Sequence, residues 1–171
     1  ITATDGKCPL YVQPASLKGI HYEMPVASAQ VKSAILLAGL YATGTTTVTQ
    51  PGAARDHTER ILQSMGAAID IDGDHITITP TTDLAPLDLT VPGDFSSAAF
   101  LMVAASIVPD SDLTITGVNL NDTRTGLLDV LQAMGAAITV TATGTEAGEP
   151  VGDIHVRYAE LNGTTIGGDV V

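Results

Sequence analysis

The feature that most constrains the fold of this chain is an internal repeat. The eight residues Leu62–Ile69 (LQSMGAAI) return 69 positions later as Leu131–Ile138 (LQAMGAAI), with seven of the eight residues identical. The order of predicted elements around this anchor also repeats: an apolar helix, a Thr-rich strand, an amphipathic helix and then alternating strands. The 171 residues therefore divide into two copies of one structural unit.

The first copy is predicted to contain two helices and about four strands, of which three can be located. In chain order these are a helix over 28–42 (SAQVKSAILLAGLYA), a strand over 45–49, a helix opened by Asp56-His57-Thr58-Glu59, and strands over 68–71 and 75–79. The first helix is apolar on most of its circumference, which is typical of an interior helix. The second has the D-x-x-E form of a capping box at its start, and Gly66 stands where a helix-terminating glycine belongs. A hairpin turn is predicted around Gly73.

The second copy is predicted to repeat this order. Its elements are a helix capped by Asp94 (DFSSAAFLMVAASIV), a strand over 113–116, an amphipathic helix ending at Gly135, and strands over 137–141 and 154–158 joined by a flexible loop over 144–152. Two prolines between 80 and 88 and the turn before Asp94 separate the copies. We expect domains over 1–91 and 92–171. Because a wholly apolar helix must be covered on every side, we expect an α/β (α+β) fold with helices enclosed by sheets.

Composition and charge exclude several classes of protein. With 44% hydrophobic and 15% charged residues, the chain lacks the low hydrophobicity and high charge of disordered chains. Its net charge of −12 argues against nucleic-acid or anionic-membrane binding, although it allows a local basic pocket. The single Cys8 excludes an internal disulfide and fits a reducing cytosol. The apolar run over 98–108 is shorter than the ~20 residues that span a bilayer, and no signal peptide is visible, so we expect a cytoplasmic protein.

Two helix starts are the candidate anion-binding sites of this acidic chain. Ser28, Ala29 and Gln30 would offer hydroxyl, amide and free backbone N–H groups at the start of the first helix. Arg55 would add positive charge just before the next helix. A simpler interpretation stays open, in which Ser28 is only an N-cap, Gln30 a surface residue and Arg55 a surface arginine.

His57, Asp94 and Arg124 also stand out, and each has a simple structural interpretation. His57 lies beside Asp56 and Glu59, where acid–base chemistry is possible, yet a solvated histidine at a helix start is the commoner case. Asp94 is expected to cap its helix, and Arg124 to be a surface group at a helix start. The other histidines have no metal-ligand spacing, so we expect no metal site.

The segments Ser28–Leu40 (SAQVKSAILLAGL) and Arg55–Arg60 (RDHTER) resemble the middle of the 5-enolpyruvylshikimate-3-phosphate synthase family, the 3-phosphoshikimate 1-carboxyvinyltransferases. Val91–Phe100 (VPGDFSSAAF) and Asn121–Gly126 (NDTRTG) continue the resemblance in the family's order, so it covers essentially the whole chain. The resemblance implies a two-lobe inside-out α/β barrel, in which each lobe is built from βαβαββ-type units with helices enclosed by sheets.

The resemblance also implies a reaction and a set of binding residues. Members of this family transfer enolpyruvyl from phosphoenolpyruvate to the 5-hydroxyl of shikimate 3-phosphate, release inorganic phosphate, and use no metal or organic cofactor. Ser28 and Ala29 would bind the phosphate of shikimate 3-phosphate, and Gln30 would touch that substrate near phosphoenolpyruvate. Arg55 would add charge at the phosphate end. Asp94 matches a position at the hinge between lobes and receives no binding role.

By the same resemblance, 1–91 is the C-terminal part of the shikimate-phosphate-binding lobe and 92–171 is the first unit of the second lobe. The family's catalytic aspartate and glutamate, its phosphoenolpyruvate-binding arginines and its N-terminal lysine–serine–arginine segment have no counterpart here. The chain begins without Met and stops shortly after a Gly-rich stretch. We therefore expect a central piece of a longer chain that carries no catalytic residue, is inactive by itself and exposes apolar surface where further units would pack.

Two alternatives stay open. The first is the enolpyruvyl transferase that acts on UDP-N-acetylglucosamine, against which RDHTE and the lack of that family's cysteine loop argue. The second is a non-catalytic binding module of two repeat units. The expected partners of the favoured interpretation are shikimate 3-phosphate, phosphoenolpyruvate and the remainder of the parent chain.

Overall fold

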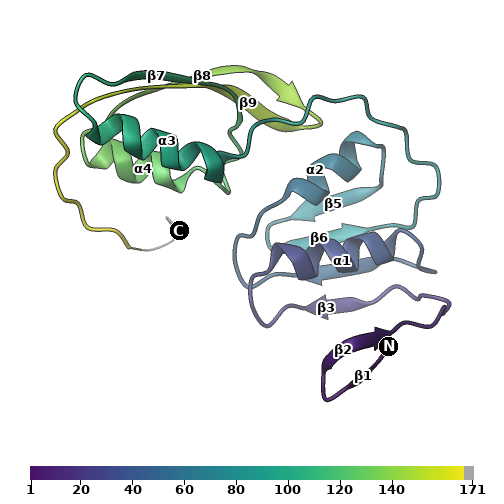
Figure 1. Cartoon of the computed structure of the whole chain (residues 1–171). Coiled ribbons are helices and arrows are strands. Elements are labelled where there is room, and N and C mark those ends of the chain that lie inside the picture. The colour runs from purple at the N-terminus through teal and green to yellow at the C-terminus, as the bar shows by residue number, and fades with distance from the viewer. Residues whose placement is uncertain (168–171) are drawn as a thin grey trace. The chain divides into compact units, whose positions relative to one another are not determined.

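The computed structural model describes residues 1–167, which form two compact units (Figure 1). Unit 1 contains Ile1–Gly52 and Ala67–Asp83, and unit 2 contains Ala53–Gly66 and the chain from Leu84 onward. These units are defined by contacts within the chain, and the lobe boundary at Val91 stays a prediction. Within the described residues, every helix is too short or too polar to cross a membrane.

Unit 1 contains a hairpin, one helix and a four-stranded sheet. Its elements are β1 (Thr2–Thr4), β2 (Lys7–Tyr11), β3 (His21–Glu23), α1 (Ala29–Gly39), β4 (Thr46–Thr49), β5 (Ile69–Asp72) and β6 (His75–Ile78). The sheet has the order β3-β4-β6-β5, in which β3 and β4 are parallel and the other neighbours antiparallel. The hairpin predicted around Gly73 is confirmed as β5 and β6, because Asp72 pairs with His75 across a turn in which Gly73 has φ +57°.

Helix α1 begins where the sequence predicts but ends earlier. Ser28 is its N-cap. Beyond Gly39 the N–H groups of Tyr41 and Ala42 donate to carbonyls three residues back rather than four, so the helix tightens and stops before the predicted end at Ala42. A Cβ at Gly39 would lie 2.6 Å from the Ile78 Cγ2 atom, so glycine allows α1 to pack closely on β6.

Unit 2 contains three helices and a three-stranded antiparallel sheet. Its elements are α2 (His57–Ser64), α3 (Phe95–Ile107), β7 (Asp112–Asn119), α4 (Gly126–Ala133), β8 (Ala137–Glu146) and β9 (Glu149–Arg157). The sheet has the order β7-β9-β8. Helices α3 and α4 lie side by side on one face of this sheet (Figure 1). As predicted, Asp94 caps α3, and its carboxylate accepts a hydrogen bond from the Ser97 N–H at 3.0 Å.

The prediction of a flexible loop over 144–152 is wrong. Strand β8 runs to Glu146 and β9 starts at Glu149, and only Ala147 and Gly148 form the turn between them. Gly152 lies inside β9, where an added Cβ would come within 2.5 Å of the Leu120 Cδ1 atom. Glycine is present there because two parts of the chain approach closely, not because the backbone is flexible.

The two sequence copies share one strand arrangement. In the first copy β6 lies between β4 and β5, and in the second β9 lies between β7 and β8. Before the first helix of each copy, the chain pairs in parallel with the strand that follows that helix: β3 with β4, and Gly93 with Val118. The repeat read from the sequence is therefore a structural βαβαββ repeat, with the first strand of the second copy reduced to a single bridge.

The hydrophobic core of unit 2 unites both helices of the second copy with its sheet. Its buried residues are Phe95, Ala98, Met102, Ala105, Val118, Leu128, Leu131, Ile154 and Val156. The opposite side of α3 is apolar but exposed, with Phe100 at 80%, Leu101 at 51% and Ile107 at 57% of full exposure. The exposed apolar surface expected from the sequence is confirmed.

Candidate functional site

The start of α1 brings together three of the predicted binding residues, Ser28, Ala29 and Gln30. The Ser28 hydroxyl accepts a long hydrogen bond of 3.4 Å from the Val31 N–H. The first turn carries no acidic side chain that would compete with an anion for the N–H groups of the helix start. Lys32, one turn along, is 1% exposed, and its Nζ donates to the Gln50 Oε1 atom at 3.1 Å. These features suit an anion at this end of α1.

Arg55, the fourth predicted binding residue, lies in unit 2, directly before α2. Its side chain is exposed, and it forms no hydrogen bond or ion pair with any other residue that the structure describes. The guanidinium is available to a ligand. That Arg55 and the start of α1 bind the same phosphate stays a prediction, because the two belong to different units.

The residues that follow Arg55 are held by a network of polar side chains. His57 Nδ1 lies 2.6 Å from Glu149 Oε1, at the start of β9. Asp56 accepts from Arg60 Nε at 2.8 Å and from Asn121 Nδ2 at 2.6 Å. Asn121, which is fully buried, also donates to Glu149 Oε2 at 2.9 Å. The start of α2 is thereby fixed to two segments of the second copy.

The capping bond predicted for the Asp56 side chain does not form. Asp56 occupies the N-cap position, but its side chain makes no capping bond. Its two carboxylate oxygens are used instead by Arg60 and Asn121. Asp94, the other predicted cap, does bond the backbone of its helix.

Two carboxyl groups of the network have shifted pKa values. Burial by itself would raise the pKa of Glu149, but hydrogen bonds from His57, Asn121 and Asn119 outweigh it and lower that pKa below its ordinary value of 4.5. For Asp56, burial again acts upward, and the hydrogen bonds from Arg60 and Asn121 lower the pKa below 3.8. Both groups are carboxylates at neutral pH.

Asp56, His57 and Glu149 are also a set of side chains that can bind a metal. One ligand atom from each lies within 4.8 Å of the others in the described chain. Every carboxylate oxygen of the set, however, already accepts a hydrogen bond or ion pair from a protein group. The cluster is thus complete as a hydrogen-bond network, and we assign it no metal.

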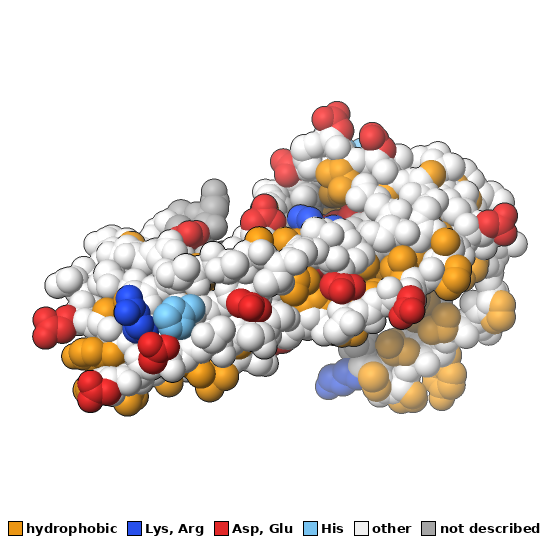
Figure 2. Space-filling view, turned by 90° about the horizontal axis from the view of Figure 1, so that it is seen from above, with side chains coloured by type: hydrophobic (Ala, Val, Ile, Leu, Met, Phe, Trp, Pro, Cys, Tyr) orange, Lys and Arg blue, Asp and Glu red, His pale blue; other side chains and the backbone are white. Residues whose placement is uncertain are grey.

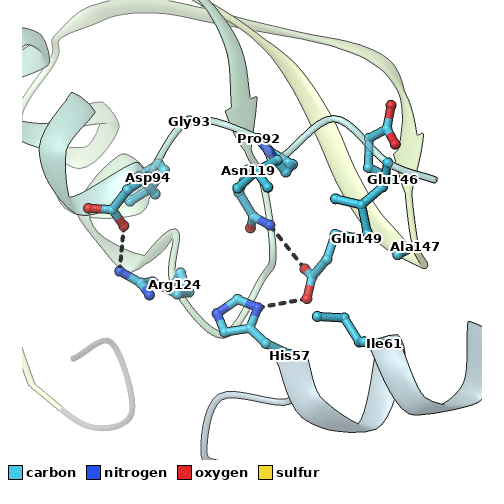
Figure 3. A pocket seen from close by; sticks show the side chains of 13 residues that line it. His57, Ile61, Pro92, Gly93, Asp94, Asn119, Arg124, Glu146, Ala147 and Glu149 are labelled. Carbon is cyan, nitrogen blue, oxygen red and sulfur yellow. Dashed lines mark hydrogen bonds and ion pairs between the residues drawn. The ribbon is translucent and has the colours of Figure 1, made fainter. Parts of the chain in front are cut away.

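A pocket of about 270 Å³ adjoins this network (Figure 3). Its walls come from α2, the segment before α3, the start of α3 and the β8–β9 turn. His57 and Glu149 lie on one side of it, and Arg124 bonds to Asp94 on the other, with 2.9 Å between Arg124 Nη2 and Asp94 Oδ1. Arg124 Nη2 also donates to the Ser96 hydroxyl at 2.5 Å. Arg124 is therefore a structural link between the starts of α3 and α4.

The sequence interpretation missed three members of the network: Asn119, Asn121 and Glu149. Glu149 lies in the segment predicted to be a loop. The sequence favours a solvated histidine at His57, whereas its side chain is 33% exposed and bonded to a nearly buried carboxylate. Asn121 belongs to the NDTRTG segment that carried the family resemblance, which was the one signal pointing to it.

Comparison with families of known proteins gives a consistent result. A family model described as EPSP synthase (3-phosphoshikimate 1-carboxyvinyltransferase) matches residues 1–166. The 3-phosphoshikimate 1-carboxyvinyltransferase of Desulforamulus reducens is 51% identical over 163 residues, which are 95% of this chain and 38% of that protein. The protein of the same name from a Synechococcus strain is 55% identical over 165 residues, 95% of this chain and 37% of that protein. The chain thus spans under two fifths of the length of these relatives.

Solved structures agree with the fold. EPSP synthase from Acinetobacter baumannii is 47% identical, with a TM-score of 0.78 over 83% of this chain and 32% of that chain. The enolpyruvyl transferase NikO from Streptomyces tendae, at 22% identity and a TM-score of 0.56, covers 72% of this chain and 28% of its own, and shares the fold. The predicted fold class, repeated units of an inside-out α/β barrel, is confirmed.

Proposed function

Because this chain belongs to the EPSP synthase family, we propose that it forms the shikimate-3-phosphate-binding part of a 3-phosphoshikimate 1-carboxyvinyltransferase. The observation that carries the proposal is the presence of SAQVKSAILLAG and RDHTER within a family match that covers residues 1–166. In the reaction, the 5-hydroxyl oxygen of shikimate 3-phosphate adds to C2 of phosphoenolpyruvate while the hydroxyl loses its proton and C3 gains one. The tetrahedral adduct then loses phosphate from C2 and a proton from C3, which gives the enolpyruvyl ether and inorganic phosphate.

The start of α1 is proposed to hold the phosphate of shikimate 3-phosphate. The backbone N–H groups near Ser28 and Ala29 lie at the positive end of the helix dipole, and the Ser28 hydroxyl can donate to a phosphate oxygen because its present hydrogen bond only uses it as an acceptor. Gln30 is exposed beside them and can bond a substrate hydroxyl. Arg55 would contribute a charged and potentially bidentate contact to the phosphate.

The excess of acidic residues does not oppose this proposal. The net charge is −12, yet acidic side chains are scattered over the face of the molecule in Figure 2 and do not gather at one place. Charges separated by more than a Debye length, ~8 Å at physiological salt, are largely screened. A phosphate is bound by the groups within hydrogen-bond reach, and the first turn of α1 has no acidic side chain.

We propose binding without turnover for this chain by itself. It spans 37–38% of its curated relatives, and the acid and base that the family uses for addition and elimination have no counterpart among its residues. Phosphoenolpyruvate is the second proposed substrate of the whole protein, no cofactor is needed, and the cytoplasm is the proposed location.

The test is an NMR titration of the ¹⁵N-labelled chain with shikimate 3-phosphate, and separately with UDP-N-acetylglucosamine and inorganic phosphate. We expect saturable shifts at Ser28, Gln30 and Arg55 with shikimate 3-phosphate, weaker ones with phosphate, and none with the sugar nucleotide. Arg55→Ala should weaken binding about tenfold, the value of one charged hydrogen bond. Arg157→Ala, which removes another exposed arginine of unit 2, is the matched control. Saturation by the sugar nucleotide instead would refute the proposal, and binding of neither compound would support a non-catalytic module.

A further inference from the structure

The start of α2 is held by a polar network in addition to a buried apolar side chain. Leu62 of α2 is 4% exposed, so the helix already has a buried apolar anchor. The polar network adds hydrogen bonds at the start of this helix. Glu149 bonds His57, and both Asn121 and Arg60 donate to Asp56. Arg60 Nη1 also donates to the Gly148 carbonyl at 3.1 Å. Burying a carboxylate such as Glu149, which is 5% exposed, is costly, and this cost points to a role in addition to stability.

Glu149 is the centre of this network. Its Oε1 atom lies 2.6 Å from His57 Nδ1, and its Oε2 atom accepts from Asn119 at 3.1 Å (Figure 3). The Oε2 atom also accepts from Asn121 at 2.9 Å. Asn121 is itself fixed, because its Oδ1 atom accepts from the backbone N–H of Thr123 at 2.9 Å and from the Thr123 hydroxyl at 2.6 Å. Both carboxylate oxygens of Glu149 are therefore bonded, and Asn121, one of their partners, is itself held by further hydrogen bonds.

The anchored residues lie next to the proposed phosphate-binding arginine. Asp56 and His57 are the first and second residues after Arg55, and both side chains are bonded into the network. Fixing the backbone of a residue has a cost in conformational entropy. When that cost is met during folding, it is not subtracted from the binding energy of a ligand.

We infer that Glu149, acting through His57 and together with Asn121, is a positioning residue that fixes the backbone before α2 so that Arg55 meets the substrate phosphate preorganised. This inference rests on the proposed function, because it needs Arg55 to bind a phosphate. Arg55 belongs to the first sequence copy and Glu149 to the second, so the second copy would order a binding residue of the first. In this role Glu149 does not itself touch the ligand.

The first experiment measures shikimate 3-phosphate binding by calorimetry to four forms of the 171-residue chain: the unaltered chain, Glu149→Gln, Arg55→Ala and the double variant. Glu149→Gln keeps the shape of the side chain but removes its charge. We expect it to weaken binding severalfold, up to the roughly tenfold loss expected of Arg55→Ala. The double variant should bind no more weakly than Arg55→Ala, because without Arg55 there is nothing left to position. Losses that multiply in the double variant would overturn the inference.

A matched control separates this role from a general effect on unit 2. His155 and Asp112 form another histidine–carboxylate pair in the same unit, with 2.8 Å between His155 Nε2 and Asp112 Oδ1, on strands β9 and β7. Asp112→Asn should leave shikimate 3-phosphate affinity unchanged. An equal loss in Asp112→Asn and Glu149→Gln would refute the positioning role.

The second experiment needs no ligand and so remains decisive if shikimate 3-phosphate does not bind. The ¹⁵N relaxation of the Arg55 backbone amide should show a rigid residue in the unaltered chain and in Asp112→Asn, and increased motion in Glu149→Gln. Unchanged Arg55 relaxation in Glu149→Gln would overturn the inference even if the proposed function holds. Should Glu149→Gln fail to fold, His57→Ala makes the same test at a side chain that is 33% exposed, with the same expected result.

Discussion

Arg55 and Arg124 occupy the same position in the two copies, 69 residues apart and directly before the start of the second helix, yet the structure uses them differently. Arg124 is bonded to Asp94 and Ser96, and its side chain is only 18% exposed. Arg55 is exposed and bonds no other described residue. The comparison teaches that the repeat keeps an arginine at one position while its surroundings decide whether that arginine becomes a structural link or stays available to a ligand.

The helices that follow these arginines differ in the same way. Helix α4 is held by Leu128 and Leu131, which lie in the core of its own copy's sheet. Helix α2 shares unit 2 with that copy and is held there at its start by polar side chains around Glu149. Apolar packing fixes a helix without specifying its ends, whereas directional hydrogen bonds fix the helix start and the residue before it.

The largest expected effect compares the two apolar anchors. Leu62 and Leu131 are equivalent in the repeat and are both 4% exposed. Leu131→Ala should lower the free energy of unfolding by about 3–4 kcal/mol, because it opens a cavity inside the core cluster. Leu62→Ala should cost about 2 kcal/mol, since polar bonds still hold α2 and the site can partly collapse. Urea denaturation followed by circular dichroism measures both, and a larger loss for Leu62→Ala would contradict the difference drawn between the helices.

The next largest effect is expected when the Glu149 carboxylate is removed from the polar network at the start of α2. Glu149→Ala leaves the side chains of His57, Asn119 and Asn121 without their acceptor, so we expect a loss of about 2–3 kcal/mol of unfolding free energy. Asp112→Asn, in the exposed histidine–carboxylate pair, should cost less than about 1 kcal/mol. Equal losses in the two variants would show that the Glu149 network does not hold α2.

The polar network around Glu149 also makes the free energy of unfolding depend on pH, which apolar packing does not do. The pKa of Glu149 is lower in the folded chain than its ordinary value of 4.5, so its contribution to stability is fully present above that pH and is lost as pH falls through the folded pKa. Asp56, with a pKa lowered from 3.8, adds to the same trend. Denaturant titrations from pH 6 to pH 3 should show a steeper loss for the unaltered chain than for Glu149→Gln. Identical slopes would mean that the ionised Glu149 side chain does not stabilise the folded chain.

The smallest expected stability effects are at the two arginines. Arg124→Ala removes the link from the start of α4 to Asp94 and should cost about 1 kcal/mol, since the pair is partly exposed. Arg55→Ala should change the unfolding free energy by less than about 0.5 kcal/mol, as for surface positions without partners. Thermal unfolding of the two variants in one buffer tests this order, and a more destabilising Arg55→Ala would reverse it.

Much of the fold could be predicted because the repeat and the helix signals are local. The apolar runs, the Asp94 cap and the glycines that end helices lie within a few residues of what they specify, and Gly66 indeed has φ +87°. The prediction of a loop at the glycines of β8 and β9 is wrong for a related reason. Gly152 is required by a close approach of Leu120, which lies outside any local window, so composition alone indicated a loop.

The network around α2 could not be predicted because its partners are far apart in the sequence. His57 and Glu149 are separated by 92 residues, and no spacing rule joins them. Asp56 and Glu59 fitted a local capping pattern, but a buried amide and an arginine offered Asp56 stronger partners than the helix backbone did. Candidate binding residues at helix starts could be named from the sequence, whereas the residues that orient them could not.

The central claim, that Arg55 serves the ligand while Arg124 serves the structure, is tested most directly by shikimate 3-phosphate affinity in Arg55→Ala and Arg124→Ala, measured by calorimetry on folded protein. The account predicts a loss of about tenfold for Arg55→Ala and no change for Arg124→Ala. Equal losses, or a loss confined to Arg124→Ala, would contradict it.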